Sequence, residues 1–285
     1  MDAPWKIRPA RPEDEPGLRT LWRRVFADDD AFLDAFFRRL FRPALTLTAW
    51  GGPKLCGALY LLDCAELVTA EETRVPCRMT YAFCTASDMR GRGLGRALVR
   101  RSVELGWEVC GAVNVLHPAT PELFRFYANA IGARPVFYIR EQTWERRPYS
   151  GGTRVYPADP ASYRELRERL LRGRAHLALN EDALTFAAET GSALLQLETA
   201  HGPGCAFADR EAETLQVREL LLPAFLPEAA YADAASAILH TLDGGRLTAR
   251  MPGAAADVPF GVLSVPEGEL VPDCGSDAWF GPAFD

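Results

Sequence analysis

The sequence DMRGRGLGRALVRRSVELGW, residues 88–107, places a glycine-rich turn directly before an amphipathic helix. RMTYAFCTAS, residues 78–87, precedes the turn and predicts a strand. After the turn, apolar residues recur every three or four positions, which is typical of a helix with one buried face. That face consists of Leu94, Leu98, Val99, Val103 and Leu105. The segment therefore predicts a strand, a glycine-rich loop and a helix in succession.

The glycine-rich turn is suited to binding an anion. Closely spaced glycines allow backbone angles that other residues avoid, and a helix start presents unpaired N–H groups and the positive end of its dipole. Neighbouring arginines add charge-assisted contacts, so a pyrophosphate is the natural ligand. The residues expected to bind it are Arg90, Gly91, Arg92, Gly93, Leu94, Gly95 and Arg96.

Two common phosphate loops do not fit this turn. A Walker loop requires G-x-x-x-x-G-K followed by Ser or Thr, and the turn has no such lysine. A dinucleotide-binding fingerprint requires a third glycine where the chain has Arg96, and an acidic residue about 20 positions on, where it has Asn114 and Val115. A turn whose glycines serve backbone geometry alone stays open as the structural alternative.

Residues 5–145 predict the element order βααβββαβαβ. The strands are expected at 5–10, 45–50, 55–68, 78–87, 111–118 and 133–145, and the helices from Asp14, from Asp29 or Asp30, after the glycine-rich turn and at 121–132. Strands that alternate with helices imply an α/β sheet with at least one parallel crossover.

The second half of the chain repeats this order. RRPYSGGT, residues 146–153, breaks every periodic pattern, so we expect a domain at 1–147 and another at 154–285. The second domain is expected to contain helices at 159–172 and 180–189, a hairpin of SALLQLET and GCAFADR, a strand at 214–223, a helix at 228–242 and a strand at 246–252. This order predicts a second, truncated copy of the same architecture.

The composition is that of a soluble globular protein. The chain has 285 residues, of which 48% are hydrophobic and 25% charged, with a net charge of -6. This balance argues against binding to nucleic acid or to an anionic membrane, both of which need a basic surface. No apolar run is long enough for a signal peptide or a membrane span, so we expect a cytoplasmic protein.

The cysteines and histidines do not form a metal-binding pattern. The seven cysteines contain no C-x-x-C pair and the four histidines no H-x-x-x-H spacing, so we expect free thiols and no metal.

The glycine-rich block resembles the acetyl-CoA-binding motif of the GCN5-related N-acetyltransferase (GNAT) superfamily. Arg90, Gly93 and Gly95 match the family pattern Q/R-x-x-G-x-G/A, after a strand and before a helix. The aromatic pair Phe126-Tyr127, which is followed by Ile131-Gly132-Ala133, resembles a second signature of the family. Ala133 stands where the family usually has Phe. The resemblance covers residues 5–145.

This resemblance implies the fold and the co-substrate. The fold is the GNAT fold, a mixed, mostly antiparallel α/β sheet whose parallel strands splay apart at the acetyl-CoA site. The second half resembles the degenerate, truncated GNAT-like domain of some bacterial tandem acetyltransferases. Its strand LQVRELLLP runs into FLPEAAYADAASAIL without an R-x-x-G-x-G motif, so the second domain should not bind coenzyme A in the family manner.

The resemblance also implies a mechanism. Backbone groups of Phe83, Cys84 and Thr85 are expected to bind the pantetheine arm and polarise the thioester carbonyl. Tyr127 is the expected acid that protonates the departing thiolate. Cys84 is an alternative nucleophile for an acyl-enzyme, although a small buried hydrophobic side chain fits this position better.

The general base cannot be identified from the sequence. Glu66, Asp63 and His117 lie on or beside strands near the expected cleft, but a structural role suits each of them better, and a water chain is a further option. The aromatic tail DAWFGPAFD is expected to dock into a groove, with the alternative that docking brings Asp285 toward the cleft.

The expected function is transfer of acetyl from acetyl-CoA to a primary amine by direct attack. The acceptor is a small-molecule or peptide amine, and the protein a monomer or homodimer. The helices of 14–41, the loop 63–77 and the second domain are the expected walls of the acceptor site. Acidic stretches at 28–30 and 71–72 are more typical of a solvated surface than of a cation site. The alternative is a catalytically weak acyl-CoA-binding or regulatory module; aminoacyl transfer is disfavoured because the coenzyme A loop is intact.

Overall fold

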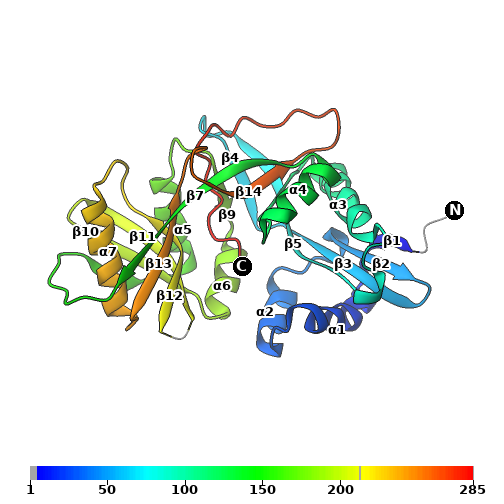
Figure 1. Ribbon diagram of the computed structural model, residues 1–285, viewed down its shortest axis with the longest axis horizontal. Helices are drawn as coiled ribbons and strands as arrows, with labels where there is room; N and C mark the ends of the chain where they lie inside the picture. Colours follow the sequence, from blue (N-terminus) through cyan, green and yellow to red (C-terminus); the bar gives the residue numbers. More distant parts are fainter. Residues whose placement is uncertain (1–4, 212, 285) are drawn as a thin grey trace. The chain divides into compact units, whose positions relative to one another are not determined.

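The computed structural model describes residues 5–211 and 213–284 and divides into two compact units. The first unit comprises the chain up to Leu67, Arg74–Pro135 and Gly261–Asp273. The second unit comprises Val68–Thr73, Val136–Phe260 and the chain from Cys274. Figure 1 shows the elements of both units as ribbons.

The first unit contains a mixed sheet. Its strand order is β1 (Lys6–Pro9), β2 (Thr46–Gly51), β3 (Lys54–Leu62), β5 (Arg74–Thr85), β6 (Val113–Leu116) and the end of β14 (Val258–Ser264). β5 and β6 run parallel, and the other neighbouring strands run antiparallel. The stretch predicted as one strand at 55–68 forms two, β3 and β4 (Ala65–Val68), which both pair with β5 and are separated by Asp63 and Cys64.

Two helix layers cover the sheet of the first unit. α1 (Glu15–Phe26) and α2 (Asp30–Arg39) lie on one face, and α3 (Leu94–Cys110) and α4 (Pro121–Ile131) on the other (Figure 1). Trp22 of α1 packs 4.5 Å from Phe36 and 5.0 Å from Tyr60, ring centre to ring centre. The predicted inner face of α3 is buried in full. The short 3₁₀ helices are Pro12–Asp14, Pro43–Leu45 and Ser87–Met89.

The second unit also contains a run of paired strands. Its strand order is β8 (Arg154–Pro157), β10 (Ala193–Thr199), β11 (Gly202–Glu211), β12 (Thr214–Leu221), β13 (Arg246–Pro252) and β7 (Arg134–Glu145). β12 and β13 run parallel and are joined by α7 (Glu228–Thr241), whose Ala234, Ala235, Ile238 and Leu239 pack on the sheet. The other helices of this unit are α5 (Pro160–Leu170) and α6 (Glu181–Glu189), with the short strand β9 (His176–Leu179) between them.

The two runs of strands have the same arrangement. β2, β3, β5 and β6, with α3 as the parallel crossover, correspond to β10, β11, β12 and β13, with α7 as the crossover. In the described part of the chain no helix follows β13, so α4 has no counterpart in the second copy. This result confirms the mixed α/β sheet and the second, truncated copy.

The last strand of each run comes from the other half of the sequence. β7, which follows α4, pairs with β13 in the second unit, whereas Val262–Ser264 of β14 pairs with Leu116–Asn114 of β6 in the first. The two units therefore differ from the expected division at 147–154, because these strands cross over. Whether catalytic and degenerate functions divide at that boundary stays a prediction. β8, β9 and β14 were not predicted.

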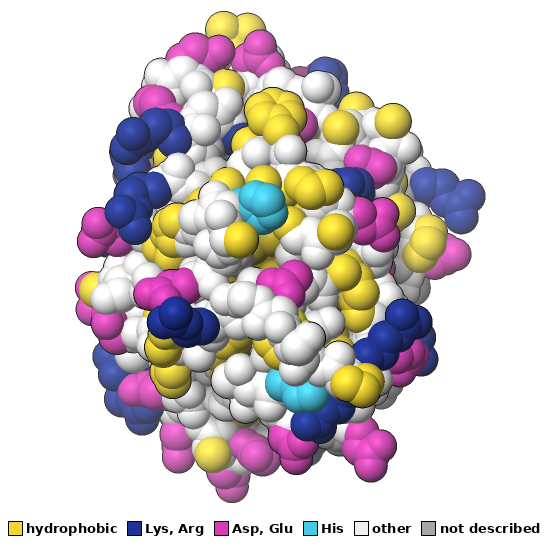
Figure 2. All heavy atoms as spheres, turned by 90° about the vertical axis from the view of Figure 1, so that its left-hand side faces the viewer, with side chains coloured by type: hydrophobic (Ala, Val, Ile, Leu, Met, Phe, Trp, Pro, Cys, Tyr) yellow, Lys and Arg dark blue, Asp and Glu magenta, His cyan; other side chains and the backbone are white. Residues whose placement is uncertain are grey.

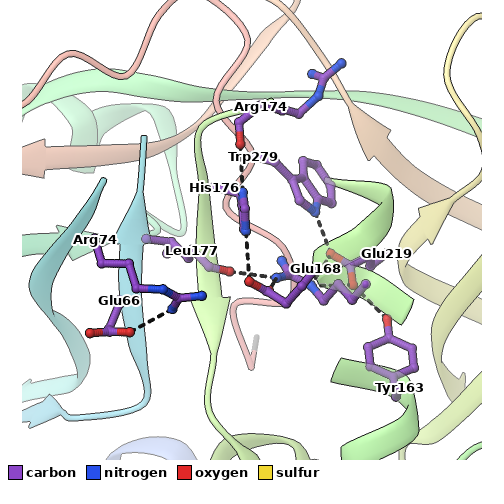
Figure 3. A network of polar contacts seen from close by, with 10 residues as sticks. Glu66, Arg74, Tyr163, Glu168, Arg174, His176, Leu177, Glu219 and Trp279 are labelled. Carbon is purple, nitrogen blue, oxygen red and sulfur yellow. Dashed lines mark hydrogen bonds and ion pairs between the residues drawn. The ribbon is translucent and has the colours of Figure 1, made fainter. Parts of the chain in front are cut away.

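A buried polar network holds the C-terminal tail in the second unit (Figure 3). Glu219 is fully buried and accepts hydrogen bonds from Arg167 Nε at 2.9 Å, Tyr163 Oη at 2.7 Å and the Trp279 indole. Burial alone lowers the pKa of Arg167, but Glu219 raises it above its ordinary value. Trp279 also exchanges backbone hydrogen bonds with Ala175 and Leu177, which confirms that the tail docks. The alternative that docking brings Asp285 toward the cleft concerns a residue outside the described ranges.

The outer surface of the protein carries both signs of charge. Figure 2 looks onto the left-hand side of Figure 1 and shows Lys and Arg side chains interspersed with Asp and Glu. The described side chains on this face therefore form neither a continuous basic nor a continuous acidic surface. None of the helices in the described ranges is both long and apolar enough to cross a membrane.

Candidate active site

The glycine-rich loop links β5 to α3 through two left-handed glycines. Gly91 has φ +73° and Gly93, the N-cap of α3, has φ +84°, angles at which a side chain causes strain. A Cβ atom built at either position meets nothing within 4 Å, so the glycines are needed for their backbone angles rather than for space. The loop consequently turns sharply into the helix while its outer surface stays open.

The backbone of this loop forms an anion site. Among the described residues, none accepts a hydrogen bond from the N–H groups of residues 91–96, and the first such bond is from Ala97 N to the Gly93 carbonyl, at 3.1 Å. A run of unpaired N–H groups at a helix N-terminus attracts an anion both by hydrogen bonding and through the helix dipole. This arrangement fits the pyrophosphate of coenzyme A.

The arginines around the loop divide into two groups. Arg90, Arg92 and Arg96 are exposed, and none of them makes an ion pair with a described residue. Arg100 instead donates to the Ala130 carbonyl, and Arg101 pairs with Glu104 and Glu108. Three arginines beside the open N–H groups are thus available for an anion. Leu94 contributes its backbone only, because its side chain is buried.

Gly95 brings β5, α3 and α4 together. A Cβ atom at this position would lie 3.0 Å from Phe83 Cζ of β5 and 3.9 Å from Phe126 Cζ of α4. Only a residue without a side chain allows the Phe83 ring to pack so closely on α3. The contact fixes the expected pantetheine strand against the first turn of the expected pyrophosphate helix.

β5 is bulged and loses its parallel partner near the loop. Ala58 pairs with Cys84 and Tyr60 with Tyr81, so Leu59 alone opposes Ala82 and Phe83, and Ala82 has φ +44°. β6 pairs with Cys77–Met79 of β5, which then continues to Thr85. This geometry leaves the end of β5, with Phe83, Cys84 and Thr85, beside the gap between two diverging parallel strands.

Cys84 is a poor nucleophile in this site. Its side chain is 5% exposed, and burial raises the pKa of the thiol to about 12. Since the thiolate is the reactive form, the thiol stays protonated and unreactive at neutral pH. The structure therefore favours the interpretation of Cys84 as a small buried hydrophobic side chain that contributes its backbone.

Tyr127 lies on α4 in the same core as the loop. Its ring packs edge-on against Phe126, with ring centres 5.1 Å apart, and the core around it includes Leu94 and Phe83. No described residue hydrogen-bonds to its hydroxyl, although this oxygen is not sealed from solvent. Burial raises the pKa of Tyr127 to about 12, so the phenol keeps its proton at neutral pH. An uncommitted, protonated hydroxyl has the properties of a proton donor.

The three residues considered as a base all have other partners. Glu66 forms an ion pair with Arg74 at 2.8 Å (Figure 3), and Asp63 forms one with Arg78 at the same distance. His117 is half-buried and has a partner in the structure. The structure therefore does not assign the role of general base to any of these three side chains.

A cavity that the sequence does not predict adjoins the loop. It has a volume of about 500 Å³ and lies between α1, the start of β3 and the segment Ala86–Asp88 with Arg90. Thr20 and Arg24 line it from α1, and Lys54 lines it from β3 with its ammonium group paired to Asp88. The helices of 14–41 were expected to form a wall of the acceptor site, and α1 is one of these helices. The cavity itself depends on how α1 packs against β3, which the local sequence does not specify.

Comparison with known proteins identifies the first unit. Residues 6–128 match the family model of the acetyltransferase (GNAT) domain. These residues are a GNAT domain. The match gives this part of the chain an acyltransferase domain of the GNAT type, and the matched range includes the glycine-rich loop. A search of curated proteins found no significant match.

Solved GNAT structures share the fold across both units. The chain superimposes on a GCN5-related N-acetyltransferase from Kribbella flavida with a TM-score of 0.66 at 17% identity, over 91% of this chain and 70% of the other. One from Anabaena variabilis gives a TM-score of 0.67 at 15% identity, over 91% and 72%. A tandem GNAT protein from the clavulanic acid biosynthesis pathway gives 0.53 at 14% identity, over 91% and 97%. At these identities the likeness shows the fold alone.

Within the described ranges, no group of three or more His, Cys, Asp or Glu side chains is placed to hold a metal ion.

Proposed function

We propose that this GNAT protein transfers an acetyl group from acetyl-CoA to the primary amine of a small molecule or peptide by direct attack. The observation that carries the proposal is the run of unpaired N–H groups at residues 91–96 beside three arginines without ion pairs. Such a site binds the pyrophosphate of coenzyme A, and the bulged end of β5 lies next to it.

Each step of the transfer has a group to perform it. Acetyl-CoA supplies the acetyl group as a thioester. Backbone groups of Phe83–Thr85 hold the pantetheine arm and stabilise the oxyanion that forms when the amine nitrogen attacks the carbonyl carbon. As the C–S bond breaks, Tyr127 gives its proton to the thiolate sulfur. The amine nitrogen loses its proton to water, because Glu66 and Asp63 are engaged in ion pairs.

The competing function is an acyl-CoA-binding module without catalysis, which the absence of an assigned base favours. Measurement of free coenzyme A released from acetyl-CoA, across a broad panel of primary amines and peptides, separates the two. We expect at least one amine to accelerate release well above hydrolysis. Tight binding of acetyl-CoA with no acceleration by any amine would support the binding module instead.

A further inference from the structure

The cavity between α1, the start of β3 and the segment Ala86–Asp88 has an accessible apolar wall. Its volume is about 500 Å³, which is large enough for a small molecule. Pro16 and Val25 line it from α1, Leu55 lines it from β3, and Ala86 lines it after β5. Each of these four side chains is exposed or half-buried rather than buried in the core. A ligand can therefore contact hydrocarbon in this cavity.

The charged side chains that line this cavity leave an excess of positive charge. Arg24 and Arg90 are exposed, and neither makes an ion pair with a described residue. Asp88, the acidic residue among those described in the lining, pairs with Lys54 at 2.5 Å. This contact lowers the pKa of the Asp88 carboxyl, so its charge is matched by that of Lys54. Two guanidinium groups without a carboxylate partner thus border the cavity.

The acidic stretch that follows α1 does not offset this charge. Asp28 accepts a hydrogen bond from the Trp22 indole at 2.7 Å. Asp29 caps the first turn of α2, and Asp30 pairs with Arg23. These three carboxylates are engaged within the protein, and none of them is among the described residues that line the cavity. The cavity therefore favours an anionic group over a cationic one.

The cavity adjoins the end of β5 that is proposed to hold the thioester. Its wall includes Ala86, the residue directly after Phe83–Thr85. Extended residues advance about 3.3 Å each, so Ala86 lies about 10 Å or less from these backbone groups. An acceptor whose amine reaches the thioester can therefore place a second group in the cavity if its chain spans a distance of this order.

We infer that the acceptor is a small primary amine with a carboxylate at the other end of an apolar chain, such as 6-aminohexanoate. Its carboxylate accepts charge-assisted hydrogen bonds from Arg24 and Arg90, and its chain lies on Val25 and Leu55. Because Arg90 also borders the coenzyme A loop, Arg24 is the residue that determines the choice of acceptor. The inference rests on the proposed acetyl transfer and adds the chemical class of the acceptor. Polyamines are disfavoured, because the same guanidinium groups repel them.

The test measures the coenzyme A that the full chain releases from acetyl-CoA with matched acceptors. These are 6-aminohexanoate, its uncharged amide 6-aminohexanamide, and the dication 1,6-diaminohexane. Acids and amides with shorter and longer chains, from 4-aminobutanoate to 8-aminooctanoate, are measured in the same way. At the best chain length we expect kcat/KM to be about 10-fold or more higher for the acid than for the amide or the diamine, because only the acid places a carboxylate against the two guanidinium groups.

The variant Arg24→Gln should remove most of the advantage of the acid over its amide, and Arg24→Lys, which keeps the charge but not the planar fork, should retain part of it. Arg23→Gln is the matched control. Arg23 is next to Arg24 on α1, but it pairs with Asp30 and does not line the cavity, so the preference for the acid should persist. Equal loss of the preference in Arg23→Gln and Arg24→Gln would overturn the assignment to Arg24.

The unaltered protein decides the inference even if Arg24→Gln does not fold. Equal kcat/KM for acid and amide at every chain length, or a preference for the diamine, would overturn the inference and leave acetyl transfer intact. Binding of acetyl-CoA without release of coenzyme A to any amine would overturn the proposed function, and the inference with it.

Discussion

The ring of Phe83 on β5 packs against Gly95 on α3 so closely that a Cβ atom at position 95 would lie 3.0 Å from Phe83 Cζ. This contact joins the strand expected to hold the pantetheine arm to the helix turn expected to hold the pyrophosphate. In the family motif, this glycine allows the backbone to approach the ligand. Gly95 is thus also required for the packing of Phe83.

The substitution Gly95→Ala should lower the free energy of unfolding by about 1–3 kcal/mol, because the added methyl group overpacks a well-filled contact. Phe83→Leu in the same background should recover part of the loss, which a double-mutant cycle by chemical denaturation measures. Gly17→Ala is the matched control: its Cβ would lie an ordinary 3.7 Å from Leu55, within a helix, so no loss is expected. Unchanged stability of Gly95→Ala would contradict the packing role.

Removal of the arginines without ion pairs should weaken the binding of acetyl-CoA. Arg90→Gln and Arg92→Gln together should raise the dissociation constant about 10-fold or more, because each loses a charge-assisted contact to phosphate oxygens. The affinity of the wild-type protein should also fall with added salt, and less steeply in the double variant. Arg101→Gln, on the same helix but paired with Glu104 and Glu108, serves as the control and should bind normally. An equal loss of affinity in the double variant and in Arg101→Gln would indicate a general charge effect.

The loop and its helix could be predicted from the sequence because both are specified locally. Glycines at 91 and 93 take the positive φ angles that a sharp turn needs, and the apolar spacing from Leu94 gives the face of α3 that is buried. Cys84 was likewise correctly favoured as a buried hydrophobic side chain. These inferences use only residues within a few positions of one another.

The exchange of β7 and β14 could not be predicted in this way. Both segments have strand-like sequences, but their partners lie far along the chain: Met251 opposes Arg140, and Val262 opposes Leu116. Alternation of side chains indicates a strand and says nothing of its neighbour. The cavity beside α1 and the pairing of Asp63 with Arg78 depend on the same non-local packing.

Tyr127→Phe should separate binding from catalysis. We expect turnover to fall about 10²-fold while acetyl-CoA binding stays within about twofold, because the ring that packs in the core is kept and only the proton donor is lost. Because the pKa of Tyr127 is raised to about 12, the wild-type rate should not decline through loss of the phenol proton up to about pH 10. Tyr156→Phe, exposed on β8, is the control. Unchanged turnover of Tyr127→Phe would exclude it as the acid.

The C-terminal tail should contribute stability rather than chemistry. Trp279→Phe removes a donor from the buried Glu219 carboxylate and should lower the free energy of unfolding by about 1–3 kcal/mol, with a larger loss on deletion of residues 279–285. The folded fraction of both variants, measured by thermal unfolding, should turn over normally. Full stability with lost turnover would instead favour the alternative that the terminal carboxylate acts on the amine.

The most direct measurement follows the acetyl group itself. The full chain is incubated with acetyl-CoA carrying a ¹³C-labelled acetyl group and with the amine that releases most coenzyme A, and both amine and protein are then examined by mass spectrometry. We predict labelled acetyl on the amine nitrogen, in an amount equal to the coenzyme A released, and none on the peptide that contains Cys84. Labelled acetyl on Cys84, or binding of acetyl-CoA with no acetylated product from any amine, would contradict direct transfer.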